Sequence, residues 1–280
     1  MKNSSGILTD TIKEVQRQLG EDLQSLTVEK VNIGIFFTGV KLSNGQGGIC
    51  FTPIKSIPEA VCCPSSARVM PSSGKLRGRS VNYFLDEMFS SSPMKRALAI
   101  AVLNALSSTC WKINPPQDYE IKLGADPLDD VVFPKEARVV VIGALVPYFK
   151  MLKKQGLTFS ILELDPRTLK EGEMGFYVPP EKADSVIQDA DYLIITGTTL
   201  INDTLEAILD KAPDHAQIVV VGPTASMLPD AFFQRGVTAL GGIAVTQPDH
   251  LLDVLAEAGS GYHFYGKSAE KIVISSKPTA

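Results

Sequence analysis

Hydrophobic residues follow two different patterns in the first quarter of the chain. In residues 8–26 they recur every three or four positions, which predicts an amphipathic helix. In residues 28–52 they alternate with polar residues, and Asn44-Gly45 separates two such runs. Alternation predicts strands that bury one face, and Asn-Gly between strands is typical of a hairpin. We therefore expect an opening helix followed by a small antiparallel sheet.

The next stretch returns to helical spacing after a long irregular segment. Residues 53–78 are rich in proline, serine and glycine, which predicts a loop. Helices are expected over 80–89 and 93–107. The sequence therefore predicts an α+β domain over residues 1–110, followed by a proline-punctuated connector over residues 111–135.

In the second half, short continuous apolar runs alternate with helical patterns. Continuous runs rich in β-branched residues are typical of strands buried on both faces of a parallel sheet. We expect strands at 139–142, 159–162, 192–195, 218–221 and 237–240, with a last strand near 271–275. Strands that alternate with helices predict a Rossmann-like parallel α/β domain over residues 136–280.

Ligands of open parallel sheets bind beyond the carboxyl ends of the strands, so the loops there are the candidate site. Gly143 follows the first strand, but Leu145 and Tyr148 stand where a dinucleotide fingerprint has its second and third glycines. Glu163 follows the second strand, 20 residues after Gly143, which is the spacing of an acid that meets a ribose hydroxyl. Alternatively, Glu163 only ends the strand in solvent.

Two further loops on this rim carry glycines and hydroxyl side chains. Backbone N–H groups and hydroxyls at such turns favour an anion, although they also satisfy ordinary turns. Asn202 or Asp203 is the expected cap of the helix from Thr204, and Gly241-Gly242 follows the fifth strand. The predicted ligand-binding residues are Gly143, Glu163, Thr196, Gly197, Thr198, Thr199, Asn202, Gly222, Pro223, Thr224 and Ser226.

Charge and hydropathy limit the partners. There are 27 basic and 31 acidic residues, for a net charge of −4, which argues against a nucleic-acid partner. The polar N-terminus and the lack of a long apolar stretch predict a cytoplasmic protein without a membrane partner. Lys75, Arg77 and Arg79 form a basic cluster, which is either a solvated charge run or an anion contact. Oligomeric state is open, with a homo-oligomer as one alternative.

Cysteine and histidine give little sign of a metal site or a catalytic site. Of four cysteines, Cys62 and Cys63 are adjacent and suit a soft metal, but no third ligand has a diagnostic spacing. No histidine forms a recognisable nucleophile–base pair, so catalytic residues and enzymatic activity stay unassigned. A metal ion or metal chelate is the candidate cofactor.

Five segments resemble the "putative heavy-metal chelation" family, a bacterial and archaeal family of unknown biochemical function. The resemblance covers nearly the whole chain, and the segments are VNIGIFFT (31–38), NALS (104–107), VIG (141–143), ITGTTL (195–200) and VGPTASMLP (221–229). It implies an N-terminal domain like that of enolase, a Rossmann-like domain, and a site in the cleft between them. It also implies a link to metal handling or anaerobic cobalamin-related metabolism. The chain has neither the length of an enolase barrel nor its magnesium carboxylates.

Three functions remain as hypotheses. The first is a protein that binds, and in one version modifies, a small anionic metabolite or metal chelate in the interdomain cleft. The second is a nucleotide- or S-adenosylmethionine-dependent transferase that uses Glu163. The third is a direct soft-metal carrier through Cys62 and Cys63.

Overall fold

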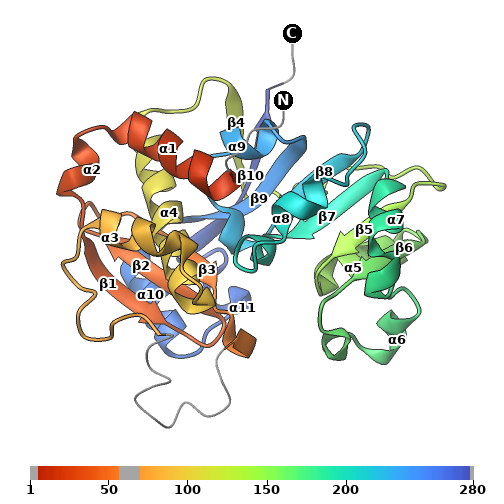
Figure 1. Cartoon of the computed structure of the whole chain (residues 1–280), viewed down its shortest axis with the longest axis horizontal. Coiled ribbons are helices and arrows are strands. Elements are labelled where there is room, and N and C mark those ends of the chain that lie inside the picture. Colours follow the sequence, from red (N-terminus) through yellow and green to blue (C-terminus); the bar gives the residue numbers. More distant parts are fainter. Residues whose placement is uncertain (1–5, 57–69, 278–280) are drawn as a thin grey trace.

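The N-terminal part of the molecule is an α+β unit built on a three-stranded antiparallel sheet (Figure 1). The structure, a computed structural model, describes residues 6–56 and 70–277. The first helices and strands are α1 (Ile7–Leu19), α2 (Asp22–Ser25), β1 (Val28–Ile33), β2 (Phe37–Leu42), β3 (Gly47–Phe51), α3 (Val81–Asp86) and α4 (Pro93–Ile113). The expected hairpin joins β2 to β3, with Gly45 at a φ of +83°.

Helix α4 covers one face of this small sheet. Pro93 lies in its first turn, and the Ser92 hydroxyl accepts a hydrogen bond from the Lys95 N–H at 3.4 Å. At Gly48 on β3, an added Cβ would lie 2.2 Å from the Ala101 carbonyl oxygen, so only glycine permits this close approach. The helix ends at Ile113, six residues beyond the predicted end, and Thr109 and Cys110 in this extension are buried against the core.

The other face of the small sheet is covered by α10 (Pro248–Ala256), which comes from the far end of the chain. An added Cβ at Gly39 would lie 2.7 Å from the side chains of both Leu252 and Leu255. The Asn32 side chain donates a hydrogen bond to the Leu252 carbonyl. A helix from the C-terminal half of the chain therefore forms part of the core of the N-terminal unit.

The C-terminal part contains a seven-stranded sheet of order β4-β10-β9-β8-β7-β5-β6 (Figure 1). The strands from β9 to β6 are parallel, whereas β10 and β4 run antiparallel at one edge. The elements are β4 (Tyr119–Leu123), β5 (Val139–Ile142), α5 (Val146–Lys154), β6 (Phe159–Leu162), α6 (Glu171–Met174), α7 (Ala183–Gln188), β7 (Tyr192–Thr196), α8 (Leu205–Leu209), β8 (Gln217–Val221), α9 (Asp230–Phe233), β9 (Val237–Val245), α11 (Gly261–Phe264) and β10 (Ala269–Ser276).

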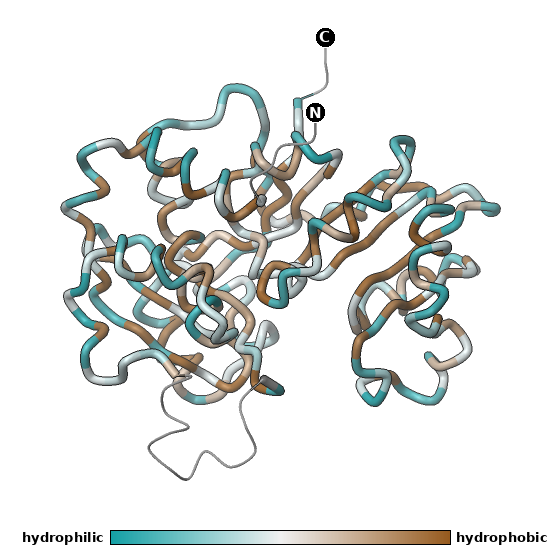
Figure 2. The backbone as a smooth tube through the Cα atoms, in the orientation of Figure 1, coloured by the Kyte–Doolittle hydropathy of each residue, from teal (hydrophilic) through white to brown (hydrophobic). Residues whose placement is uncertain are grey.

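The central strands are buried on both faces, as their apolar runs predict. Every residue of β5 is buried, and Figure 2 shows the parallel strands as hydrophobic along most of their length. Side chains on one face pack with α5, and those on the other face pack with α7, α8 and the N-terminal part. From β5 the chain moves to β6 on one side and then to β7 on the other. The carboxyl ends of β5 and β7 therefore form the point at which strand order reverses.

The predicted fold class, an α+β unit followed by a Rossmann-like parallel α/β unit, is confirmed. Three local predictions were wrong. The predicted connector contains β4, which pairs with β10. Gly241 and Gly242 lie inside β9, where added Cβ atoms would meet Pro127 and Ser226 at 2.8 Å. Helix α8 begins at Leu205 with Thr204 at its N-cap, because the left-handed Asp203, at a φ of +62°, precedes it.

Within residues 6–56 and 70–277, no helix is both long enough and apolar enough to cross a bilayer.

Candidate functional site

A pocket of about 300 Å³ lies at the reversal point of the sheet. We call it the rim pocket. Its lining comes from the carboxyl ends of β5, β6 and β7, from the 3-10 turn η6 (Gly197–Leu200), and from α7 and α8 with their approaches. The lining residues are Ile142, Gly143, Leu162, Glu163, Leu164, Val178, Pro180, Ala183, Asp184, Ile187, Thr196, Thr198, Thr199, Asn202, Thr204, Ala207, Ile208 and Lys211.

Gly143 brings two strand ends together at the base of the rim pocket. Its φ is +102°, and an added Cβ would lie 2.6 Å from Cγ2 of Thr196. Its N–H donates to the Leu162 carbonyl at 2.8 Å, which ties the ends of β5 and β6 together. Both the backbone conformation and the contact therefore require glycine at this position.

The turn after β7 presents a pair of hydroxyls to the rim pocket. The hydroxyl oxygens of Thr196 and Thr198 lie 3.2 Å apart, and Thr196 Oγ1 also accepts from the Thr198 N–H at 3.4 Å. The Thr199 hydroxyl instead donates to the Thr196 carbonyl at 2.7 Å and is buried. Asn202 is exposed, and its Oδ1 accepts from the Thr204 hydroxyl at 2.7 Å. Thr196 and Thr198 are therefore the hydroxyls best placed to meet a ligand.

Glu163 supplies a half-buried carboxylate at the end of β6. Its Oε1 accepts from the Asp165 N–H at 3.0 Å, and within residues 6–56 and 70–277 no hydrogen bond reaches its Oε2. The other charged groups of the lining are Lys211 and Asp184, which form an ion pair with each other. The lining therefore carries one formal negative charge in excess.

The N-terminal part reaches the same rim through Lys55. Its ammonium pairs with Asp165 at 2.6 Å, two residues after Glu163. Hydrogen bonds from Arg167 and then from Lys55 hold the pKa of the Asp165 carboxyl well below its usual range. All residues that line the rim pocket nevertheless lie between 142 and 211, so the predicted interdomain location of the ligand stays a prediction.

The loop after β8 lies elsewhere, in the joint between the two parts of the molecule. Asn104 on α4 donates from Nδ2 to the carbonyls of Ile49, Pro223 and Thr224, at 2.8, 3.3 and 3.1 Å. Thr224 is 2% exposed, and its Oγ1 accepts from the Phe51 N–H at 3.1 Å. These contacts fasten the 3-10 turn η7 (Pro223–Ala225) beneath α4 and β3.

Ser226 is also occupied within this joint. It is 4% exposed, donates to the Pro223 carbonyl and accepts from the Ile243 N–H, both at 2.8 Å. Gly197 packs on the same joint, since an added Cβ there would lie 3.1 Å from the Ala225 nitrogen.

The predicted ligand-binding residues therefore divide into two groups. Those that line the rim pocket are Gly143, Glu163, Thr196, Thr198, Thr199 and Asn202. Those outside its lining are Gly197, Gly222, Pro223, Thr224 and Ser226. The walls from α7 and α8 were not among the predicted site residues, although Thr204, Ile208 and Lys211 have the spacing of one helix face.

Tyr148, at the third fingerprint position, packs on the opposite face of the sheet from the rim pocket. Its hydroxyl lies 3.0 and 3.1 Å from the two carboxylate oxygens of Asp126. Burial, followed by the nearby Asp126 charge, raises the pKa of this phenol far above its usual value. The side chain therefore has its own polar partner away from the rim.

Two family models match the chain, and both are described as "putative heavy-metal chelation". One covers residues 126–274, more than half of the chain, and the other covers residues 16–107. This chain belongs to that family. An uncharacterized protein of Methanocaldococcus jannaschii is 28% identical over 202 residues, which are 70% of this chain and 73% of that protein.

Two solved structures of family members with unknown function have the same fold. The protein from Pyrococcus horikoshii has a TM-score of 0.75 at 20% identity and covers 96% of this chain and 99% of its own. The protein from Desulfitobacterium hafniense has a TM-score of 0.67 at 17% identity, with coverages of 95% and 98%. At these identities the likeness concerns the fold alone.

The metal in the family description has no evident ligand set among the residues that the structure describes. Across 6–56 and 70–277, no three side chains of His, Cys, Asp or Glu are grouped so that they could hold a metal ion. Burial raises the pKa of the Cys110 thiol to about 12 and that of Cys50 further still. The predicted soft-metal pair, Cys62 and Cys63, lies outside the described residues.

Proposed function

We propose that this protein binds a small organic molecule, either a metabolite or an organic metal chelate, in the rim pocket. The observation that carries the proposal is the position of this pocket at the reversal point of a parallel sheet, between Gly143, Glu163 and the Thr196–Thr198 hydroxyl pair. The metal link comes from the family description. A chelate as ligand is compatible with the absence of a ligand set among the described residues.

The lining favours a ligand with an apolar body and a hydrogen-bond donor at one end. Ile142, Ile187 and Ile208 provide apolar walls, and Glu163 provides an acceptor. Because the one cation of the lining, Lys211, already pairs with Asp184, an anionic group beside Glu163 would meet net negative charge. We therefore place a hydroxyl-bearing group there, and any anionic part of the ligand nearer the open rim.

A nucleoside-containing cofactor is a second candidate because of Glu163 in particular. An acid at the end of the second strand accepts hydrogen bonds from ribose hydroxyls in Rossmann folds, and Glu163 and Gly143 line one pocket here. A nucleotide- or S-adenosylmethionine-dependent transferase would use this arrangement. The leucine at the second fingerprint position argues for a single nucleoside over a dinucleotide.

The test measures which small molecules the purified protein retains, by native mass spectrometry. Ala207→Trp would fill the rim pocket, and Glu163→Ala would remove its acceptor. We expect both variants to lose a retained molecule that the wild type holds. Thr224→Val, which changes the buried joint, is the matched control and should keep it. Equal retention by Ala207→Trp and wild type would contradict the proposal.

A thermal-shift panel of adenosine, ATP and S-adenosylmethionine separates the two candidates. Stabilisation by one of these compounds that Glu163→Ala abolishes supports the nucleoside cofactor. Retention of a different molecule, with no stabilisation by any of the three, supports a metabolite or chelate instead.

A further inference from the structure

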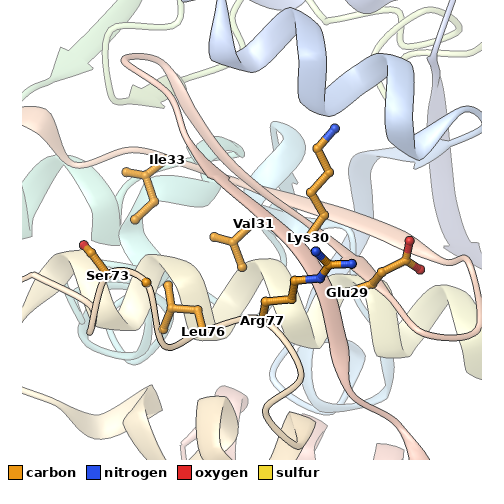
Figure 3. A pocket seen from close by; sticks show the side chains of 8 residues that line it. Glu29, Lys30, Val31, Ile33, Ser73, Leu76 and Arg77 are labelled. Carbon is orange, nitrogen blue, oxygen red and sulfur yellow. The ribbon is translucent and has the colours of Figure 1, made fainter.

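Strand β1 is an edge strand of the small sheet, and among the residues that the structure describes only its beginning has a partner on the outer side. There the Val28 N–H donates to the Arg79 carbonyl at 2.9 Å, and the Gly78 N–H donates to the Val28 carbonyl at 2.8 Å. Beyond this short ladder, a cavity of about 550 Å³ separates β1 from residues 73–77 (Figure 3). We call this cavity the edge groove. Its lining residues are Glu29, Lys30, Val31, Ile33, Ser73, Gly74, Leu76 and Arg77.

The backbone of β1 offers hydrogen-bonding groups to the edge groove. The Gly34 N–H donates to the Phe37 carbonyl at 3.0 Å, which makes these two residues a hydrogen-bonded pair. Such pairs alternate along an antiparallel ladder, so Ile33–Thr38 and Val31–Val40 are the non-bonded pairs. The N–H and C=O groups of Val31 and Ile33 therefore point away from β2, toward the edge groove.

Side chains give the edge groove an apolar side and a separate polar side. Val31 and Ile33 lie on the same face of β1, and Leu76 lies across from them (Figure 3). Ile33 is 37% exposed, and the apolar surface continues at the hairpin tip with Ile35 and Phe36. In an added strand, every second side chain, if apolar, would pack against this surface.

One guanidinium of the edge groove has no ion-pair partner among the residues that the structure describes. Lys30 pairs with Asp253 on α10 at 2.9 Å, and Glu29 shares Lys41 with Asp249, at 3.1 and 2.8 Å. Arg77 is exposed, and it forms no ion pair or hydrogen bond through its side chain with any residue in 6–56 or 70–277. The edge groove is therefore complementary to an acidic group near Arg77.

We propose that β1 binds an extended acidic peptide segment of another protein as an additional strand. The segment would continue the short ladder that Gly78 and Arg79 form with Val28, and would hydrogen-bond to the backbone of Val31 and Ile33. One of its carboxylates would pair with Arg77, and its apolar side chains would rest on Val31, Ile33 and Leu76. This site is separate from the rim pocket and does not depend on its function.

The test uses the full chain and a fluorescent synthetic peptide that alternates valine with aspartate. Binding is followed by anisotropy, and we expect Arg77→Ala to weaken it by about tenfold. Lys75→Ala is the matched control, because Lys75 lies in the same loop but does not line the edge groove. Val31→Pro should also weaken binding, since proline removes the outward N–H and that N–H takes no part in the ladder with β2.

Four outcomes would overturn the proposal. One is the absence of binding at millimolar peptide. A second is equal binding of a peptide with lysine in place of aspartate, and a third is equal binding to the Arg77→Ala variant. The fourth is a dimer in sedimentation velocity that dissociates on Val31→Pro, because the edge would then belong to a second copy of the chain.

Discussion

The loops that follow β7 and β8 are alike in composition but differ in surroundings. Each leaves a buried parallel strand, begins with glycine and continues through a 3-10 turn that carries hydroxyl side chains. The β7 loop presents Thr196 and Thr198 to the rim pocket. The β8 loop lies beneath α4 and β3, where Thr224 is 2% exposed.

The difference shows that the elements packed against such a turn, and not the sequence of the turn, decide whether its hydroxyls can meet a ligand. Thr224 Oγ1 already accepts from the Phe51 N–H, and Asn104 donates to two carbonyls of the turn, those of Pro223 and Thr224. Within the described part of the chain, the hydroxyls of Thr196 and Thr198 form hydrogen bonds only inside their own turn. A turn hydroxyl is thus a candidate ligand group only where no second element has used it.

The largest expected effect comes from breaking the buried joint at Asn104. Asn104→Ala would remove the donor shared by three carbonyls of the joint and leave a void in α4 packing. We expect the free energy of unfolding to fall by about 3 kcal/mol, measured by urea denaturation.

Asn202→Ala in the β7 loop is the matched control. Asn202 is exposed, and of the residues that the structure describes its side chain bonds only to Thr204, so the change should stay within about 0.5 kcal/mol. Similar losses for the two variants would show that the joint and the β7 loop contribute equally to stability. That result would contradict the difference drawn between the β7 and β8 loops.

A smaller loss in the free energy of unfolding is expected for a substitution at Gly143, where the β7 loop meets the end of β5. Gly143→Ala would place a Cβ 2.6 Å from Thr196 Cγ2 at a φ of +102°. We expect about 2 kcal/mol of destabilisation in urea, together with loss of any molecule retained in the rim pocket, because Thr196 must shift.

Gly156→Ala is the control that separates the backbone strain of a positive φ from the contact of the added Cβ with Thr196. Gly156 also has a positive φ, of +71°, but an added Cβ there meets no atom within 4 Å. Its loss should be about 1 kcal/mol with unchanged ligand retention. If both alanine variants behaved alike, the contact between Gly143 and Thr196 would have no separate effect.

The parallel sheet and the position of its rim could be predicted because both depend on local patterns. Continuous apolar runs marked β5 to β8, and the 20-residue spacing placed Glu163 on the same rim as Gly143. Strand β4 was missed although its YEIKL sequence alternates as a strand does, and only its pairing with β10, some 150 residues later, had no local signal.

The division of the predicted ligand-binding residues between the rim pocket and the buried joint had no local signal in the sequence either. Whether Thr224 is open depends on Asn104 and Phe51, which precede it by more than 100 residues. In the same way, α10 covers the small sheet although nothing in residues 28–52 indicates a partner from the far end of the chain. Such packing is set by tertiary contacts over long sequence separation.

The smallest expected effect concerns the Lys55–Asp165 ion pair, which brings the N-terminal part to the open rim as well. Because the pKa of Asp165 is lowered in the folded chain, its carboxylate stabilises the fold above the unfolded value of about 3.9, and this contribution is lost as pH falls through the lowered pKa. Lys55→Met should raise the pKa of Asp165 part of the way toward its usual value, since Arg167 remains, and should make the acid range of the stability profile shallower. A carboxyl-carbon NMR titration of Asp165 measures the change, and Lys150→Met, which removes an exposed cation elsewhere, should leave that pKa as it is. An unaltered Asp165 titration in Lys55→Met would mean that the N-terminal part contacts the sheet through the buried joint without this bridge to the rim.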